Sequence, residues 1–491
     1  MRGHPNGNAG RARPGNSTLI SPHLPHGDRL HSATSRFQSH QLHAPSRLCS
    51  SSVHLCLTRR SSLLTSSAAL RSATLTWLAA LIGLVSGCDQ PLPPLPAPVI
   101  TTPAPKVDLD RFSPQHIGRA IEGKPWISHV NVADLDRDGR MDILACDDQL
   151  NAVVWLRQFS PGRFEETTLM ADLASPVHVE AVDMDGDGDL DLLVSSMGQV
   201  FPNNDKIGSV IILENNGHQQ FIRHTLLERV ARVTDLRAGD FDGDGKPDLA
   251  VAQFGYNQGE IRWMRNKGNW QFDSQILLSL PGTINVCVAD LNGDRTLDIV
   301  ALVSQQYEEI YLFENSGYGT FTNKILFGST NEDYGSSGIS LCDLNRDGRP
   351  DILYTNGDGF AYADPGKRSW HGLQWLENGG QGFFKFHRIG DMAGAYSPIG
   401  VDLEGRGVTD IVCVSGFNDW KNPKSASLVL FRNDGKQSFT QIVLAHQPIQ
   451  LISVAAGDLD GSGRPSLVTG AFFAYPPFDN MARLTLWRPR P

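Results

Sequence analysis

The sequence predicts an all-β fold, a seven-bladed β-propeller of four-stranded blades closed by an N-terminal outer strand. An acidic, glycine-bearing loop followed at once by an apolar strand recurs seven times. Successive copies begin about 50 to 60 residues apart, a period that is typical of solenoids and propellers. Further strand patterns surround every loop. The copies begin at Asp134, Asp183, Asp240, Asp290, Asp343, Asp402 and Asp458.

Each of the first six repeats contains four strand patterns in a fixed order. A short alternating run precedes the loop, as at 285–289, and an apolar run follows it, as at 299–303. A third run, such as LVLFRN, leads into an Asn-x-Gly hairpin signal at 433–435. The fourth run begins with Phe and places Leu or Ile five residues later, as in Phe439 and Leu444. Four strands per repeat are what one propeller blade requires.

The seventh repeat has no fourth run after its third one at Leu484–Trp487. The same spacing of Phe and Ile occurs ahead of the first loop, at Phe112 and Ile117. We therefore expect the N-terminal strand to complete the seventh blade, which leaves no open sheet edge to aggregate. The predicted propeller covers residues 108–491.

The spacing within each loop predicts a calcium site. Oxygen-bearing side chains stand at positions 1, 3, 5 and 9, Gly at position 6 permits the tight turn, and the carbonyl of position 7 adds an oxygen. Five loops carry the full ligand set, so we expect up to five structural calcium ions. The predicted ligands are Asp134, Asp136, Asp138 and Asp142; Asp183, Asp185, Asp187 and Asp191; Asp240, Asp242, Asp244 and Asp248; Asp290, Asn292, Asp294 and Asp298; and Asp343, Asn345, Asp347 and Asp351.

The alternative is that Asp, Asn and Gly simply form turns here, since short polar side chains cap their own backbone. Three loops with four carboxylates each argue against turns alone, because unneutralised carboxylates repel one another. The last two loops depart from the pattern. Arg406 places a cation at position 5 of the sixth loop, and Ser462 and Ser466 replace two ligands of the seventh. We expect both of these loops to hold no ion.

These repeats, such as DLDRDGRMDIL from Asp134 and DMDGDGDLDLLV from Asp183, resemble the FG-GAP or VCBS repeats of bacterial secreted proteins. Their loops are similar to the calcium loops of integrin α-subunit propellers. The resemblance implies a propeller that serves as an adhesion or ligand-binding platform and whose calcium is structural.

The N-terminal 87 residues predict export. They contain a single acidic residue, Asp28, and their first half has no hydrophobic periodicity, so we expect a disordered leader. Arg71 precedes an apolar stretch at 75–85, the arrangement of a signal peptide, and this stretch is too short to span a membrane.

The signal ends in LVSGC at Cys88, which resembles the bacterial lipobox. The resemblance implies cleavage before Cys88, lipidation of its thiol and anchoring to a membrane of the bacterial cell envelope, facing the periplasm or the surface. The alternative is an unlipidated signal with an incidental cysteine. Residues 88–107 then form a proline-rich linker.

The charge balance bears on the partners. The chain has a formal net charge of −10, which makes nucleic acid an unsuitable partner. We expect a monomer whose partner is an unidentified extracellular or periplasmic protein or glycan.

Two places can hold such a ligand. Alternation of the innermost strands directs polar side chains towards the propeller axis, and long loops opposite the acidic ones carry aromatic side chains. Solvated channel lining and packing of the loops against one another are the alternatives. The candidates are His129, Asn131, His178, Glu180, Asp235 and Arg237 at the axis, and Trp370 and Trp420 in the loops.

No motif for catalysis is present: the sequence lacks a Gly-x-Ser-x-Gly elbow, His-Glu-x-x-His, paired-Cys zinc spacing and a phosphate loop. We therefore predict a binding module and not an enzyme. The alternatives are a polysaccharide lyase or hydrolase acting at the axial cluster, and a purely structural envelope protein.

Overall fold

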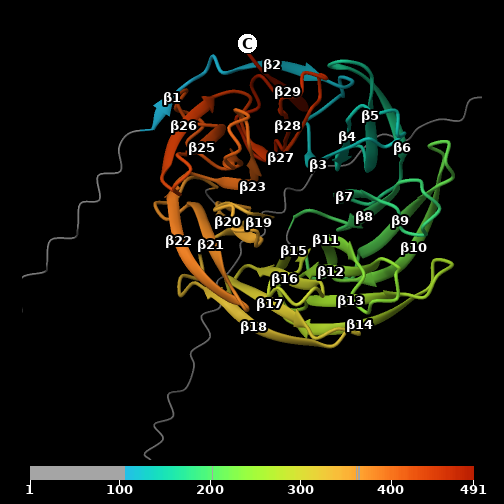
Figure 1. Cartoon of the computed structure of the whole chain (residues 1–491). Helices are drawn as coiled ribbons and strands as arrows, with labels where there is room; N and C mark the ends of the chain where they lie inside the picture. The colour runs from blue at the N-terminus through green and yellow to red at the C-terminus, as the bar shows by residue number, and fades with distance from the viewer. Residues whose placement is uncertain (1–104, 202, 361, 363–364, 491) are drawn as a thin grey trace, which may run out of the picture. The chain divides into compact units, whose positions relative to one another are not determined.

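The computed structural model describes residues 105–490, apart from 202, 361 and 363–364. These residues form a ring of seven sheets, one for each predicted blade, and the predicted seven-bladed propeller is confirmed (Figure 1). Within the described residues no helix is long and apolar enough to cross a membrane. The signal segment, Cys88 and nearly all of the predicted linker lie outside the described residues.

Each blade is an antiparallel sheet that begins at the propeller axis and ends at the rim. The strands, blade by blade from the axis outward, are β3 (Ile127–Ala133), β4 (Asp142–Asp147), β5 (Ala152–Ser160) and β6 (Arg163–Met170); β7 (Pro176–Val182), β8 (Asp191–Ser196), β9 (Gly208–Asn215) and β10 (Phe221–Val230); β11 (Arg232–Gly239), β12 (Asp248–Phe254), β13 (Glu260–Asn266) and β14 (Phe272–Ser279); β15 (Thr283–Ala289), β16 (Asp298–Val303), β17 (Glu309–Asn315) and β18 (Phe321–Gly328); β19 (Ser336–Cys342), β20 (Asp351–Asn356), β21 (Gly372–Gly380) and β22 (Phe383–Asp391); β23 (Ala395–Val401), β24 (Asp410–Ser415), β25 (Leu428–Asn433) and β26 (Phe439–Ala445); and β27 (Leu451–Gly457), β28 (Ser466–Ala471), β29 (Leu484–Pro489) and β2 (Phe112–Ile117).

The N-terminal segment closes the ring, as predicted. Strand β2 pairs antiparallel with β29, with Phe112 opposite Pro489 and Ile117 opposite Leu484, so it supplies the outer strand of the seventh blade. A second fastening was not predicted. Strand β1 (Lys106–Val107) adds to the edge of the sixth blade, parallel to β26. The sequence did not predict it because two residues are too few to show a strand pattern.

The hydrophobic core lies between the blades. Every junction of neighbouring blades contains its own cluster of buried apolar side chains, and the seven clusters follow one another around the ring. The cluster between the last and first blades contains Ile117, Ile127 and Leu484, so the closing strand is part of the core. Each second strand is buried on both faces, which explains its continuous apolar sequence.

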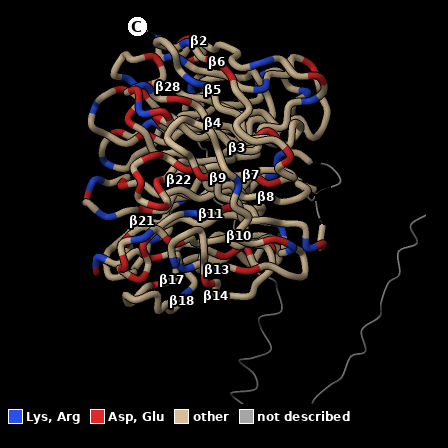
Figure 2. The backbone as a smooth tube through the Cα atoms, turned by 90° about the vertical axis from the view of Figure 1, so that its right-hand side faces the viewer, with Lys and Arg blue, Asp and Glu red and all other residues tan. Residues whose placement is uncertain are grey.

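The strand register assigns the loops to two faces of the ring. In the third blade Gly239 pairs with Asp248 beside the acidic loop, whereas Arg232 pairs with Phe254 at the other end of the same two strands. The acidic loops therefore lie on one face, and the starts of the first strands lie on the opposite face. In the side view, charged residues lie mainly in the loops at these two faces (Figure 2).

Candidate functional site

The ninth position of the acidic loop is a buried aspartate that opens the second strand. In the second blade Asp191 Oδ2 accepts a hydrogen bond from the amide of Met184 (3.0 Å), and its Oδ1 accepts one from the amide of Asn215 (2.8 Å). Because burial disfavours the ionised form, it raises the pKa of this carboxyl to about 6 in five loops. These carboxyls belong to Asp142, Asp191, Asp248, Asp298 and Asp351. A neighbouring cation would favour their ionised form.

The first aspartate of each loop caps the backbone of that loop. Asp183 accepts hydrogen bonds from the amides of Gly186 (2.8 Å) and Gly188 (3.1 Å), and Gly188 occupies the left-handed region at φ 100°. The seventh loop has the same bond, from the amide of Gly463 to Asp458 (2.9 Å). Turn formation therefore accounts for position 1 in every loop, and the argument for a metal rests on the other carboxylates.

Three loops gather carboxylates closely enough to share one ion. In each of them, one oxygen from positions 1, 3 and 9 lies within 4.8 Å of the other two. A hard cation such as Ca²⁺ prefers oxygen ligands of this kind. Asp136 Oδ1 is buried and has no hydrogen-bond partner among the described residues, which is the state expected of a ligand atom. The clusters are Asp134, Asp136 and Asp142; Asp183, Asp185 and Asp191; and Asp240, Asp242 and Asp248.

The three clusters differ in how the protein balances their charge. Arg157 forms an ion pair with Asp136 in the first loop, and Arg265 forms one with Asp242 in the third. In the second loop no described Lys or Arg pairs with any of the four predicted ligands. The carboxylate of Glu214 lies near this loop, and it adds to burial in raising the pKa of Asp185. The second loop therefore has the greatest need of a cation.

The fourth and fifth loops hold fewer carboxylates. The amide of Asn292 donates to Asp294 Oδ2 (2.9 Å), and the amide of Asn345 donates to Asp347 Oδ2 (3.0 Å). These amides bond the carboxylates at position 5 without adding charge. Arg295, at position 6 of the fourth loop, adopts a φ of 72° where the other loops have Gly. These bonds link positions 3 and 5 of both loops, which carry one carboxylate fewer than each of the first three.

In the sixth loop an arginine supplies the positive charge. Arg406 Nη2 donates to both carboxylate oxygens of Asp410 (2.8 and 3.0 Å), and its Nε lies 2.5 Å from Glu404 Oε2. Arg432 also pairs with Glu404, and together with Arg111 these guanidinium groups lower the pKa of that carboxyl to about 2. A side-chain cation thus takes part in the bonds that a metal would otherwise make.

The structure brings the predicted axial residues together on neighbouring first strands. The rings of His129 and His178 have centroids 4.4 Å apart. His178 Nδ1 lies 3.1 Å from Asp235 Oδ1, and Arg237 Nε lies 3.4 Å from the same oxygen. Glu180 Oε2 is 3.8 Å from Arg237 Nη1. Arg237 thus lies between two carboxylates, those of Asp235 and Glu180.

Burial defines the chemistry of this axial cluster. It lowers the pKa of both His129 and His178 well below the ordinary value, and the charge of Arg237 acts in the same direction. Both imidazoles are therefore neutral at pH 7, and His178 is only 2% exposed. Asn131 lies on β3 two residues beyond His129 and is half-buried.

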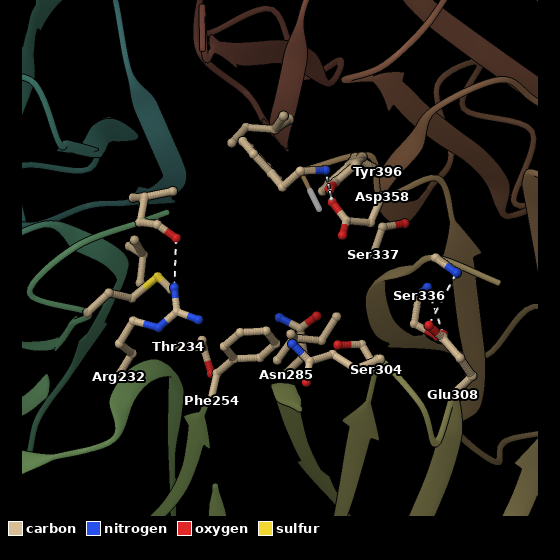
Figure 3. Close-up of a pocket in the computed structure, with 18 of the residues that line it drawn as sticks. Arg232, Thr234, Phe254, Asn285, Ser304, Glu308, Ser336, Ser337, Asp358 and Tyr396 are labelled. Carbon is tan, nitrogen blue, oxygen red and sulfur yellow. Dashed lines mark hydrogen bonds between the residues drawn. The ribbon is translucent and has the colours of Figure 1, made fainter. Parts of the chain in front are cut away.

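A cavity of about 430 Å³ lies at the face opposite to the acidic loops (Figure 3). Its wall includes Ser128, Val177 and Thr234, which each immediately precede a residue of the axial cluster. The cavity therefore lies directly above that cluster. Aromatic side chains, among them Tyr256 and Phe360, line it. A volume of this size is within the range of small-ligand sites.

Two carboxyl groups on the cavity wall are held by hydrogen bonds. Glu308 is 2% exposed and accepts hydrogen bonds from the amides of Ser336 (2.9 Å) and Gly335 (3.3 Å). Burial raises the pKa of Glu308 to about 7 despite these bonds. Asp358 accepts a hydrogen bond from the hydroxyl of Tyr396, and burial raises its pKa as well.

The two predicted tryptophans do not belong to the cavity wall. Trp370 Nε1 donates to the carbonyl of Asp333 (2.9 Å), and Trp420 packs against the core between the sixth and seventh blades. For both side chains the structure favours the packing alternative. Other aromatic residues of the same loops, Phe360 and Phe472, do line the cavity.

Sequence reasoning missed most of the cavity wall. Arg232 begins a first strand, and Phe254 and Glu308 border short loops between second and third strands. Asp358 lies in the long loop 357–371 of the fifth blade, but it is not aromatic. Only the blades with long loops between the second and third strands were considered for this face, so the third and fourth blades were not considered there. A search of the corresponding position in every blade would have found these residues.

The chain matches known repeats and proteins. Segments 134–194, 240–301, 290–354 and 402–469 match the FG-GAP-like repeat family, and each segment spans two successive acidic loops. Cartilage acidic protein 1 of Homo sapiens is 24% identical over 260 residues, which are 47% of this chain and 39% of that protein. The chain thus spans well under half the length of this relative.

Solved structures give further matches. BBS1N in complex with ARL6DN, soaked with lead, aligns at a TM-score of 0.46 and 10% identity, over 74% of this chain and 93% of that one. The V. cholerae biofilm matrix protein Bap1 aligns at a TM-score of 0.39 and 12% identity, over 75% of this chain and 88% of that one.

Replacing Asp185 tests the metal site of the second loop. After removal of metal by a chelator, calcium should raise the melting temperature, with a dissociation constant on the order of 10⁻⁴–10⁻³ M. Asp185→Ala should lower the calorimetric stoichiometry by about one ion. Asp460→Ala, at the same position of the seventh loop, is the matched control and should lower it by none. An absent calcium effect, or equal losses from both variants, would show that the loops are turns only.

Glu308 should make stability depend on pH. Its pKa is higher in the folded chain than in the unfolded one, so stability falls as pH rises from about 4.5 to about 7 and stays lower above that. Glu308→Gln should remove this loss and stabilise the protein at pH 8 by about 2–3 kcal/mol relative to its effect at pH 4.5. Urea unfolding at both pH values measures it. Glu332→Gln removes an exposed charge from the same wall, and an equal pH effect in both variants would contradict the prediction.

Proposed function

We propose, from the premise that this chain is an FG-GAP-like repeat β-propeller protein with three Asp clusters able to bind metal, that it is a calcium-stabilised binding module. Calcium in the acidic loops would neutralise their carboxylates and stiffen one face of the ring. The ligand would enter from the opposite face. In this proposal the metal is structural and does not contact the ligand.

The observation that carries the proposal is the cavity above the axial cluster. Its wall combines several aromatic rings with a few polar groups that other residues hold in place, which is the usual composition of a ligand site. Glu308 and Asp358 can accept hydrogen bonds from a ligand, and Tyr256 and Phe360 offer ring faces. A glycan or a protein side chain of the extracellular or periplasmic space fits this chemistry.

The same observations bear on the alternatives. A lyase or hydrolase acting at the axial cluster would require substrate to reach His178, whose side chain is almost fully buried beside Asp235. A purely structural role would leave the cavity without a ligand, so a binding experiment separates it from the proposal.

We also propose that the protein is exported and anchored through a lipid on Cys88, with the proline-rich linker separating the propeller from the membrane. The support is the signal-like segment that ends at this cysteine. Labelled palmitate should enter the protein in bacterial cells, and Cys88→Ala should abolish labelling and release the protein from the membrane fraction. Labelling that survives the substitution would overturn the anchor.

A binding screen tests the main proposal. Residues 105–491 should capture at least one ligand from a glycan array or from surface-protein extracts. Tyr256→Ala should weaken that binding about fivefold, since an aromatic contact contributes about 1 kcal/mol. Tyr318→Ala is the control, because Tyr318 is 87% exposed in the hairpin after β17, far from the cavity wall. No captured ligand, or an equal loss from both variants, would overturn the proposal.

A further inference from the structure

Arg232 is a buried cation without an acidic partner. It is 1% exposed, and its Nη1 donates to the carbonyls of Val200 (2.8 Å) and Phe201 (2.9 Å). Its Nε and Nη2 have no hydrogen-bond partner among the described residues. The ring of Phe254 lies 4.5 Å from its guanidinium carbon. The arginine is therefore fixed in place with two of its three nitrogens unused.

A second deeply buried arginine among the described residues, Arg483, is held differently. Arg483 is 7% exposed and pairs with Asp147 (2.7 Å) and Glu166 (2.8 Å). Burying a cation is costly, and paired carboxylates offset the cost. Arg232 has carbonyl oxygens and an aromatic ring in their place. It remains charged at neutral pH, because burial lowers its pKa only to about 10.

Arg232 lines the cavity, and its Nε and Nη2 are themselves almost without accessible surface. Figure 3 shows its guanidinium on one side of the cavity, while Asp358 and Glu308 project from the opposite side. The cavity thus has a positive end and an end of carboxyl groups that accept hydrogen bonds. A ligand with one carboxylate and several hydroxyls would fit this polarity in one orientation only.

We propose that the cavity binds a uronic acid residue of an acidic glycan, with its carboxylate on Arg232 and its hydroxyls towards Asp358 and Glu308. The inference rests on the proposed binding function and names its ligand class. Planar guanidinium groups bind carboxylates through paired hydrogen bonds, and the unpartnered Nε and Nη2 would form such a fork once a side-chain shift exposes them. Aromatic rings such as those of Tyr256 and Phe360 can contact the apolar face of a sugar ring. An acidic peptide shares the carboxylate but not the cluster of hydroxyls.

Matched ligand pairs test the proposal on the full chain. Calorimetry should compare methyl glycosides and disaccharides of glucuronic and galacturonic acid with the glucose and galactose compounds that lack only the carboxylate. We expect the uronates to bind at least about tenfold more tightly, the effect of one charge-assisted contact. A glutamate-rich peptide serves as the competing acidic ligand and should bind more weakly than the uronates.

Variants then locate the contact. Arg232→Gln should reduce uronate binding to the level of the neutral sugar, and Arg232→Lys, which keeps the charge but loses the fork, should fall between. Arg229→Gln is the control, because Arg229 has an 86% exposed side chain three residues earlier. If Arg232→Gln fails to fold, the ligand pairs on the unaltered protein still decide the question.

The outcomes separate this inference from the proposed function. Uronates that bind no more tightly than neutral sugars, or binding that Arg232→Gln leaves unchanged, would overturn the uronate assignment while leaving a binding module. Tighter binding of the peptide would overturn it in favour of a protein partner. Absence of binding by every compound would overturn the assignment, and the broader screen would then decide on the binding function itself.

Discussion

One buried aspartate connects the acidic loop and two strands in each of the first five blades. It opens the second strand, bonds the backbone of its own loop and bonds the amide at the end of the third strand, as Asp191 does with Met184 and Asn215. A single side chain thereby fixes a loop and two strands. Because a buried polar group without partners is costly, strands and loop form their hydrogen bonds together. The seventh blade has Ser466 at this position, and it is the blade that the N-terminal strand completes.

Arginines offset the acidic groups of several loops, and two places without such pairing lie on opposite faces of the ring. Arg157 and Arg265 offset the first and third loops, and Arg406 offsets the sixth. The second loop is left with uncompensated negative charge, whereas Arg232 is left with uncompensated positive charge. Each exception marks a place where a missing partner from outside the chain would complete the electrostatics: a cation on one face and an anion on the other.

The sequence was sufficient for the fold because the signals are local and repeated. The Asn-x-Gly turns, the apolar second strands and the Phe that opens each fourth strand occur at the same offsets in successive blades. The carboxylate clusters were predictable for the same reason, since positions 1, 3 and 9 come from one loop. Strand β1 and the cavity were not predictable. Val107 pairs with Val443, which is distant in the sequence. Arg232, Glu308 and Asp358 come from three different blades and line one cavity only in the folded ring.

The seventh blade contains strands from both ends of the described chain. Strands β2 and β29 lie side by side at the rim, and the amide of Arg490 donates to the carbonyl of Arg111 (2.9 Å), so both ends of the described chain meet there. Joining these ends and cutting the chain in another hairpin would produce a circular permutant with the same blades and the same core clusters. Which blade combines two distant segments therefore depends only on where the chain begins and ends within the ring. The cavity and the acidic loops would be the same in such a permutant.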